Sequence, residues 1–142
     1  MLHLVHPVFV HFSAAFLVAG AIVEALAIFA GRERIERFGA VLVLAGTVSL
    51  VPTVAAGYLA QNVLDVPAGA GDLLWRHERV GLGILAVFLA SQLWKAWFRG
   101  RVPVGQRTLY ACVVLLGAAL VAYGAFLGGE MVYGLGVGVK GA

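Results

Sequence analysis

The sequence predicts an all-α integral membrane protein, folded as one domain with four transmembrane helices in an up-down bundle. Hydrophobic residues make up 62% of the 142 residues and charged residues only 12%, whereas about 25% of a typical soluble domain is charged. A bilayer core about 30 Å thick requires roughly 20 apolar residues of helix, and the chain contains four such stretches. Because backbone polar groups in lipid must be bonded internally, each stretch should be helical.

The four predicted spans are joined by short connections, so that neighbouring helices run antiparallel. They cover about residues 7–30, 38–59, 73–98 and 108–129. Pro7 suits the first position of the first helix, and Asp72 is a favourable N-cap for the third. The first stretch is too long, and lacks the basic start, for a cleaved signal peptide. The sequence shows no convincing internal repeat.

The distribution of basic residues predicts the orientation of the bundle. Seven of the ten Lys and Arg residues lie at the end of the third span or in the loops after the first and third spans: Arg32, Arg34, Arg37, Lys95, Arg99, Arg101 and Arg107. By the positive-inside rule this side is cytoplasmic and both termini are outside. We therefore expect a multi-pass protein of the bacterial inner membrane with periplasmic termini. The net charge of +3 is scattered, which favours the lipid bilayer rather than nucleic acid as the partner.

All four histidines fall toward the predicted outer side, and two of them suggest a cofactor. His11 and His77 lie near the starts of the first and third helices, which are diagonal partners in an up-down bundle. Two imidazoles at one depth on diagonal helices can hold a planar macrocycle, and haem iron accepts axial histidine. We therefore predict one haem b with His11 and His77 as axial ligands. His6 replaces His11 if the first helix is rotated.

Two other interpretations of the histidines stay open. Each one can be an interfacial anchor or a hydrogen-bonded residue at a helix end. Alternatively, His3, His6 and His11 can join His77 around zinc or copper, since imidazole suits both metals. The spacing argues against that metal site, because two residues five apart on a helix, such as His6 and His11, point about 140° apart.

Three other charged residues are candidates for a role at the site or in the core. Arg76 and Arg79 flank His77, and we expect them to pair with haem propionates or to anchor the helix at lipid headgroups. Glu24 is the acid that lies deep in a span, where ionisable groups are costly and often functional. We expect it to be structural rather than a proton relay, with hydrogen-bond partners among Thr47, Ser91 and Gln92.

The opening residues His6-Pro7 and Val10-His11-Phe12 resemble the start of an uncharacterised family of small four-helix bacterial membrane proteins. The resemblance continues at Gly57-Tyr58, at His77, and through Gly128-Gly129-Glu130 to Gly136-Val137-Gly138-Val139. It implies the four-helix fold and draws attention to His6, His11 and His77. Related chains carry a histidine just before the Gly-Val-Gly-Val segment, where this chain has Leu135.

These features together predict a small membrane-bound b-type cytochrome that holds one haem near the outer face and transfers electrons. Its redox partner would be quinone or another membrane subunit, because the short loops leave no soluble domain. The alternative is a non-catalytic accessory subunit of a larger respiratory or photosynthetic membrane complex. Either function is more probable for these spans than a stand-alone enzyme.

Overall fold

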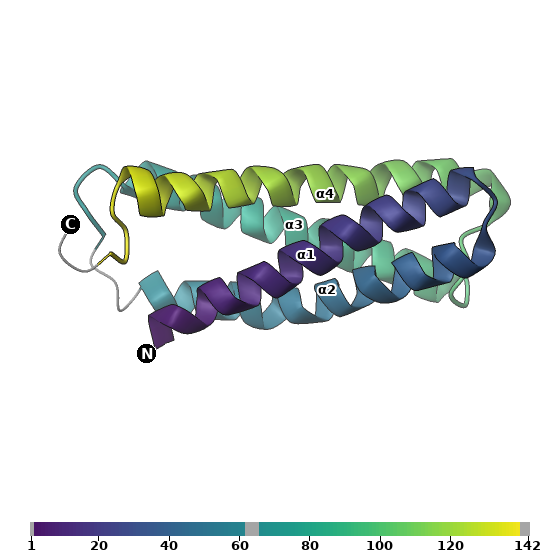
Figure 1. The fold of residues 1–142 in the computed structure, drawn as a ribbon, viewed down its shortest axis with the longest axis horizontal. Helices are drawn as coiled ribbons and strands as arrows, with labels where there is room; N and C mark the ends of the chain where they lie inside the picture. Colours follow the sequence, from purple (N-terminus) through teal and green to yellow (C-terminus); the bar gives the residue numbers. More distant parts are fainter. Residues whose placement is uncertain (1, 62–65, 140–142) are drawn as a thin grey trace.

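The computed structural model describes the backbone of residues 2–61 and 66–139, and the side chains in these ranges from His6 onward. Four long helices dominate it (Figure 1): α1 (Leu2–Phe29), α2 (Glu33–Gln61), α3 (Gly71–Trp97) and α4 (Arg107–Gly129). The short η1 (Val104–Gln106) precedes α4, and the π-helical turn η2 (Glu130–Gly134) extends it. All regular structure in these described ranges is helical, and each long helix is long and apolar enough to span a membrane. The predicted fold class is confirmed.

The helices extend beyond the predicted apolar stretches at several ends. α1 begins at Leu2, so that Pro7 lies inside the helix rather than at its first position. α3 begins at Gly71 with Ala70 as its cap, which places Asp72 in the first turn and not at the N-cap. These differences have one physical cause: crossing lipid requires apolar side chains, but continuing a helix does not. An acid in the first turn still interacts favourably with the helix dipole.

The helices pack in the expected up-down order. α1 packs along α2 and against α4, α3 packs against α4, and the contact between α2 and α3 is the sparsest of the four seams. α1 runs obliquely across the bundle in Figure 1; it stays packed on α2 and also contacts α4 toward the end opposite the chain termini. Consequently α1 and α3 are diagonal partners, as are α2 and α4.

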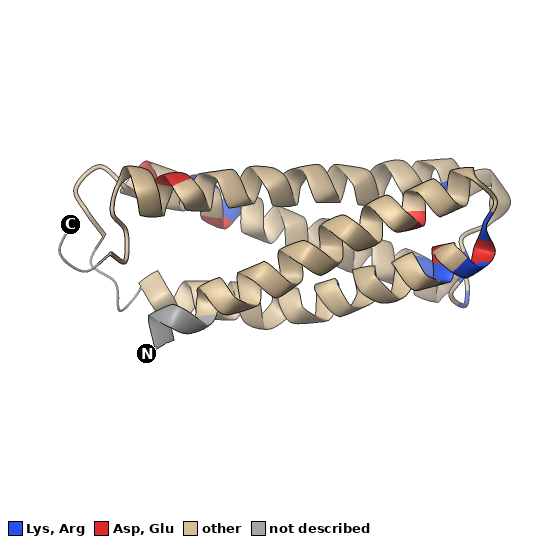
Figure 2. Ribbon diagram, viewed as in Figure 1, with Lys and Arg blue, Asp and Glu red and all other residues tan. Residues whose placement is uncertain are grey.

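The two ends of the bundle differ in charge. Both termini lie at one end (Figure 1), here called the termini end. The α1–α2 and α3–α4 connections lie at the other end, where Lys and Arg residues gather along the ribbon (Figure 2). This arginine-rich end carries five exposed arginines: Arg32, Arg34, Arg37, Arg99 and Arg101. The charge asymmetry expected from the sequence is thus present along the bundle axis.

Glycines allow α1 and α2 to approach closely, as small residues do in membrane proteins. A Cβ atom added at Gly39 on α2 would lie 2.5 Å from the backbone nitrogen of Glu24 on α1. In the middle of the bundle, Gly46 accommodates Leu17, and Gly117 accommodates the ring of Phe88 in the same way. Leu17 and Phe88 are both fully buried in the central hydrophobic cluster.

The two hairpins repeat one arrangement, which the sequence alone does not show convincingly. Gly117 lies 71 positions after Gly46, and Phe88 lies 71 positions after Leu17. The same separation relates Glu24 and Lys95, which contact each other between the hairpins. The fully buried Val43 and Val114 are related in the same way. Hairpin α1–α2 therefore corresponds to hairpin α3–α4 through a pseudo-two-fold axis along the bundle, an arrangement known for parallel repeats in membrane proteins.

We expect Gly39→Ala to destabilise the protein, because the added methyl group would collide with the backbone of α1. Overpacking of this kind costs about 1–3 kcal/mol and should lower the melting temperature measured by circular dichroism in detergent. Gly83→Ala is the matched control, since a Cβ at Gly83 on α3 meets no atom within 4 Å. An unchanged or higher melting temperature for Gly39→Ala would show that the α1–α2 contact is looser than the structure indicates.

Candidate functional site

Two histidines occupy equivalent positions on diagonal helices near the termini end. His6 on α1 is half-buried, and its Nδ1 donates a hydrogen bond to the carbonyl oxygen of Thr53 on α2 at 2.9 Å. His77 on α3 is also half-buried, and its Nδ1 donates to the carbonyl oxygen of Gly124 on α4 at 3.1 Å. Both hydrogen bonds join residues 47 apart. Each hairpin therefore holds its histidine in the same way.

These hydrogen bonds determine the tautomer of both rings. A carbonyl oxygen can only accept, so Nδ1 carries the proton and Nε2 of the neutral ring carries a lone pair. No hydrogen bond within the described part of the chain engages Nε2 of either His6 or His77. Histidines that ligate metals have this arrangement, in which the other ring nitrogen donates to a carbonyl or carboxylate. Both imidazoles are thus prepared to act as ligands through Nε2.

Glycines on the neighbouring helices accommodate the two rings. A Cβ atom at Gly57 would lie 3.0 Å from Cε1 of His6, and one at Gly128 would lie 3.3 Å from Cε1 of His77. Gly57 and Gly128 are themselves equivalent positions of the two hairpins. A Cβ at either position would require the ring to shift by a few tenths of an ångström, so the glycines leave room for both imidazoles.

The surroundings of the pair are only partly apolar. His6 lies within electrostatic range of His77. Gly81 is one turn beyond His77 on the same face of α3, and a Cβ there would meet no atom within 4 Å. The buried residues of the hydrophobic clusters extend only to Leu17 on α1 and Ile84 on α3, short of both histidines. Ser13, Thr53 and Leu127 are nevertheless buried at this end of the bundle.

His11 does not join His77, contrary to the first expectation for the ligand pair. Its side chain is exposed on the outer surface of α1, where Nδ1 donates to the carbonyl oxygen of Pro7 at 2.6 Å. The face of α1 that packs into the bundle carries His6, Ser13, Leu17 and Glu24. His6 thus occupies the place first predicted for His11, in the rotated alternative. The side chain of His3 lies outside the described residues.

The arginines beside His77 point away from the bundle interior. Arg76 and Arg79 are exposed, and the guanidinium of Arg79 lies 5.0 Å from the ring centroid of Trp75. Arginine stacked on an interfacial tryptophan suits an anchor at lipid headgroups. Pairing with haem propionates stays a prediction for these two residues.

The structure tests the proposed zinc or copper site only within the described side chains. Among these, no three His, Cys, Asp or Glu side chains come together in a group that could hold a metal ion. A closed structural zinc site needs four ligands, whereas the described inward histidines are two, His6 on α1 and His77 on α3. A histidine pair as ligands of a haem stays a prediction.

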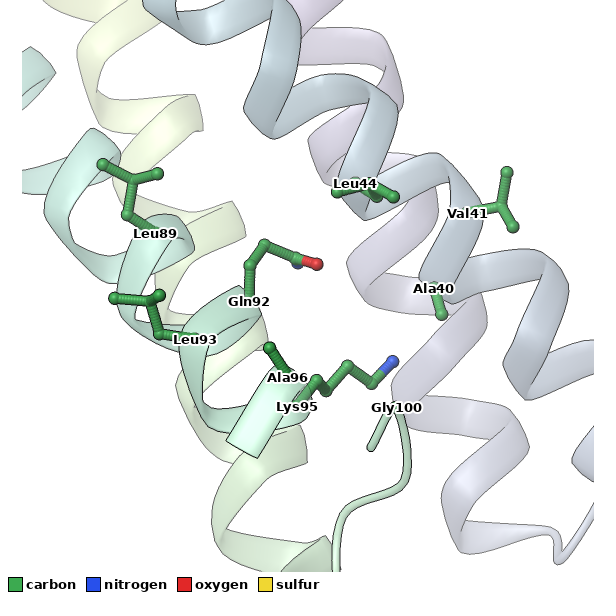
Figure 3. A pocket seen from close by; sticks show the side chains of 9 residues that line it. All are labelled: Ala40, Val41, Leu44, Leu89, Gln92, Leu93, Lys95, Ala96 and Gly100. Carbon is green, nitrogen blue, oxygen red and sulfur yellow. The ribbon is translucent and has the colours of Figure 1, made fainter. Parts of the chain in front are cut away.

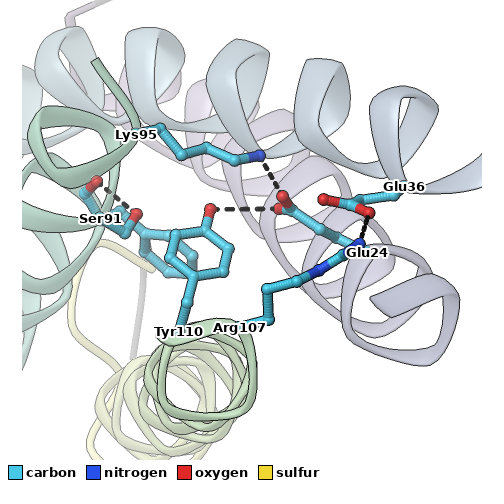
Figure 4. Close-up of polar contacts among 7 residues, drawn as sticks. Glu24, Glu36, Ser91, Lys95, Arg107 and Tyr110 are labelled. Atoms are coloured by element: carbon cyan, nitrogen blue, oxygen red, sulfur yellow. Dashed lines mark hydrogen bonds and ion pairs between the residues drawn. The ribbon is translucent and has the colours of Figure 1, made fainter. Parts of the chain in front are cut away.

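A buried ion pair joins the same two diagonal helices near the arginine-rich end (Figure 4). Glu24 on α1 is fully buried, pairs with Lys95 on α3, and accepts a hydrogen bond from the hydroxyl of Tyr110 on α4 at 3.3 Å. Glu24 is therefore bonded across the bundle as expected, but to other partners. Ser91 donates to the carbonyl oxygen of Phe88, and Thr47 to that of Val43. Lys95, expected at the cytoplasmic end of the third span, turns inward to Glu24.

A second ion pair has the same sequence spacing, and this spacing is the signal by which the sequence could have predicted both pairs. Glu36 on α2 pairs with Arg107 on α4, and both the Glu24–Lys95 and the Glu36–Arg107 pairs join residues 71 apart. His6 and His77 have the same separation. A scan for complementary as well as identical residues at this spacing would have predicted Lys95 as the partner of Glu24.

Comparison with known proteins gives the family but no activity. A family model described as "Predicted membrane protein (DUF2231)" matches residues 2–141. The chain belongs to this family. DUF2231 denotes a domain of unknown function, and no curated protein and no solved structure matches the chain significantly. The four-helix membrane fold agrees with the family description, and any function must be argued from the geometry of this DUF2231 member.

We expect Glu24→Gln and Lys95→Met each to lower stability strongly, because either change leaves the other charge buried without a partner. Breaking a buried pair costs about 3–5 kcal/mol, measurable as a lower melting temperature in detergent. The exchange Glu24→Lys with Lys95→Glu should recover much of the loss, since the two positions are equivalent.

Glu33→Gln is the control for the buried pair, because Glu33 and Arg37 form an exposed ion pair at 3.6 Å. Exposed pairs contribute about 0–1 kcal/mol, so this variant should melt close to the wild type. Single variants at Glu24 and Lys95 that melt like Glu33→Gln would contradict the buried ion pair.

Proposed function

We propose that this protein is a small b-type cytochrome that binds one haem b between His6 and His77 and transfers electrons. One observation carries the proposal: two equivalent imidazoles on diagonal helices are each fixed through Nδ1 to a carbonyl of the neighbouring helix. Bundle proteins commonly build cofactor sites from inward side chains on facing helices. The DUF2231 fold would thus be a scaffold for a cofactor on its pseudo-two-fold axis.

The chain's own residues would perform three tasks at this site. His6 and His77 would hold the haem through their imidazoles, the carbonyls of Thr53 and Gly124 would hold the tautomer of both rings, and apolar helices would exclude water. Haem bound there would supply a one-electron carrier. Because both histidines would be engaged in holding the group, the site favours electron transfer over substrate chemistry.

The proposed orientation places this site at the outer face of a bacterial inner membrane. The exposed arginines gather at the opposite end of the bundle, and the positive-inside rule assigns such an end to the cytoplasm. The inward turn of Lys95 removes one residue from that count, but the asymmetry remains. Lipid surrounds the helices, and the electron donor or acceptor would be quinone or another membrane subunit.

The protein purified from haem-replete cells should show the absorption spectrum of low-spin haem. His6→Ala and His77→Ala should each abolish or convert this spectrum, because each removes one axial ligand. His11→Ala is the matched control and should leave the spectrum unchanged, since His11 is exposed and hydrogen-bonded within its own helix.

Two results would contradict this function. A colourless but folded wild-type protein would exclude the cytochrome and favour the accessory-subunit alternative. Loss of the spectrum in His11→Ala, with His6→Ala unaffected, would assign the ligand to the outer face of α1 and contradict the proposed site.

A further inference from the structure

The arginine-rich end carries more positive charge than its acids neutralise. Each acidic side chain at this end is already paired with a base: Glu24 with Lys95, Glu36 with Arg107, and Glu33 with Arg37. Four exposed arginines make no ion pair within the described part of the chain: Arg32, Arg34, Arg99 and Arg101. The first two belong to the α1–α2 connection and the start of α2, and the other two to the α3–α4 connection. These four residues, here called the arginine patch, leave free positive charge at one end of the bundle (Figure 2).

The patch consists of arginine alone. Lys95 lies one turn before Arg99 in the sequence, but its side chain extends from the side of α3 that faces α2 (Figure 3) and pairs with Glu24. A guanidinium group is planar, stays charged, and presents donors in a fork that matches the oxygens of a phosphate group. The patch therefore suits a phosphate-containing anion.

The backbone holds Arg99 at the surface in a conformation that favours glycine. Arg99 has a φ of +55°, and the following Gly100 has a φ of +85°. The N–H of Gly100 donates to the carbonyl oxygen of Lys95 at 2.8 Å, which closes the end of α3. A left-handed conformation is unfavourable for arginine, and such strain is concentrated at functional sites. The chain thus carries a cation where glycine or asparagine would fit the backbone better.

Exposed apolar residues beside the patch place it at the membrane interface. Trp97, the last residue of α3, is 83% exposed, and Ile35 and Phe38 are exposed near the start of α2. Tryptophan at the end of a span lies at the level of the lipid headgroups. One turn before Trp97, the exposed Leu93 already faces hydrocarbon. The arginines are therefore at the depth of lipid phosphates, which favours a phospholipid over a soluble polyanion such as nucleic acid.

We propose that the arginine patch binds the headgroup of an anionic phospholipid selectively. The phosphate of phosphatidylglycerol has no cation of its own, so it can neutralise the free guanidinium groups. Phosphatidylcholine carries a quaternary ammonium, which the patch would repel. Basic clusters at the ends of transmembrane helices attract anionic lipids in this way. This binding does not require haem, so it can be tested independently of the proposed cytochrome.

Native mass spectrometry of the full-length protein in detergent tests the proposal by titration with dioleoylphosphatidylglycerol or dioleoylphosphatidylcholine. The wild type should bind phosphatidylglycerol more tightly. The combined variant Arg32→Gln, Arg34→Gln, Arg99→Asn and Arg101→Gln should lower this preference roughly tenfold or more, because each basic residue near the membrane surface adds to the attraction. Arg99→Asn alone should lower it roughly two- to fivefold without lowering the melting temperature, since asparagine tolerates the left-handed backbone.

The matched control is the double variant Glu33→Gln with Arg37→Gln, which removes one negative and one positive charge from an exposed ion pair. Its preference for phosphatidylglycerol should equal that of the wild type. Equal affinity of the wild type for the two lipids would overturn the proposal, as would an undiminished preference in the folded combined variant. Binding of a short DNA duplex without any preference for phosphatidylglycerol would assign the patch to a soluble polyanion instead.

Discussion

The ion pair between Glu24 and Lys95 is the contact on which the arrangement of this bundle depends. Charged side chains within membrane spans are costly unless they are paired in the protein interior. Glu24 and Lys95 lie on diagonal helices, so they can meet only if the two hairpins face each other in one register. The pair therefore specifies how hairpin α1–α2 docks against hairpin α3–α4.

The register set by this pair also determines which residues face inward at the opposite end of the bundle. His6 lies 18 residues before Glu24 (24 − 6), and His77 lies 18 residues before Lys95 (95 − 77). Eighteen residues are five full helical turns, or about 27 Å. Each histidine is thus on the same helix face as the charged residue of its own helix. Docking at one end of the bundle therefore also fixes which helix faces carry the two histidines at the other.

Length and hydropathy were sufficient to predict the four helices, their antiparallel order and the diagonal relation of α1 to α3. They could not predict which face of α1 turns inward, because both faces are apolar in lipid: Phe12 is exposed and Leu17 is buried. The polar residues of α1 indicate which of its faces turns inward. Ser13 and Glu24 lie on the face of His6, whereas His11 points elsewhere.

The internal repeat was hidden for a physical reason. Residues near a two-fold axis meet their own equivalents, and two identical charges there would repel each other. Glu24 therefore corresponds to Lys95, and Glu36 to Arg107, so a search for identities misses the positions that join the hairpins. Neutral imidazoles do not repel in this way, and His6 and His77 are identical. Lys95 was counted among the basic residues of the cytoplasmic side because it lies near the end of the third span, although its side chain turns inward to Glu24.

Solid-state NMR of the protein in bilayers tests the ion pair most directly, because the chain has only two lysines, Lys95 and Lys140. Replacing Lys140 with Arg and labelling lysine Nζ with ¹⁵N and glutamate Cδ with ¹³C leaves one ammonium signal to follow. The predicted result is a short-range dipolar contact between Lys95 Nζ and a glutamate Cδ that disappears in Glu24→Gln. A Lys95 signal without this contact, or one unchanged by Glu24→Gln, would contradict the docking of the two hairpins described above.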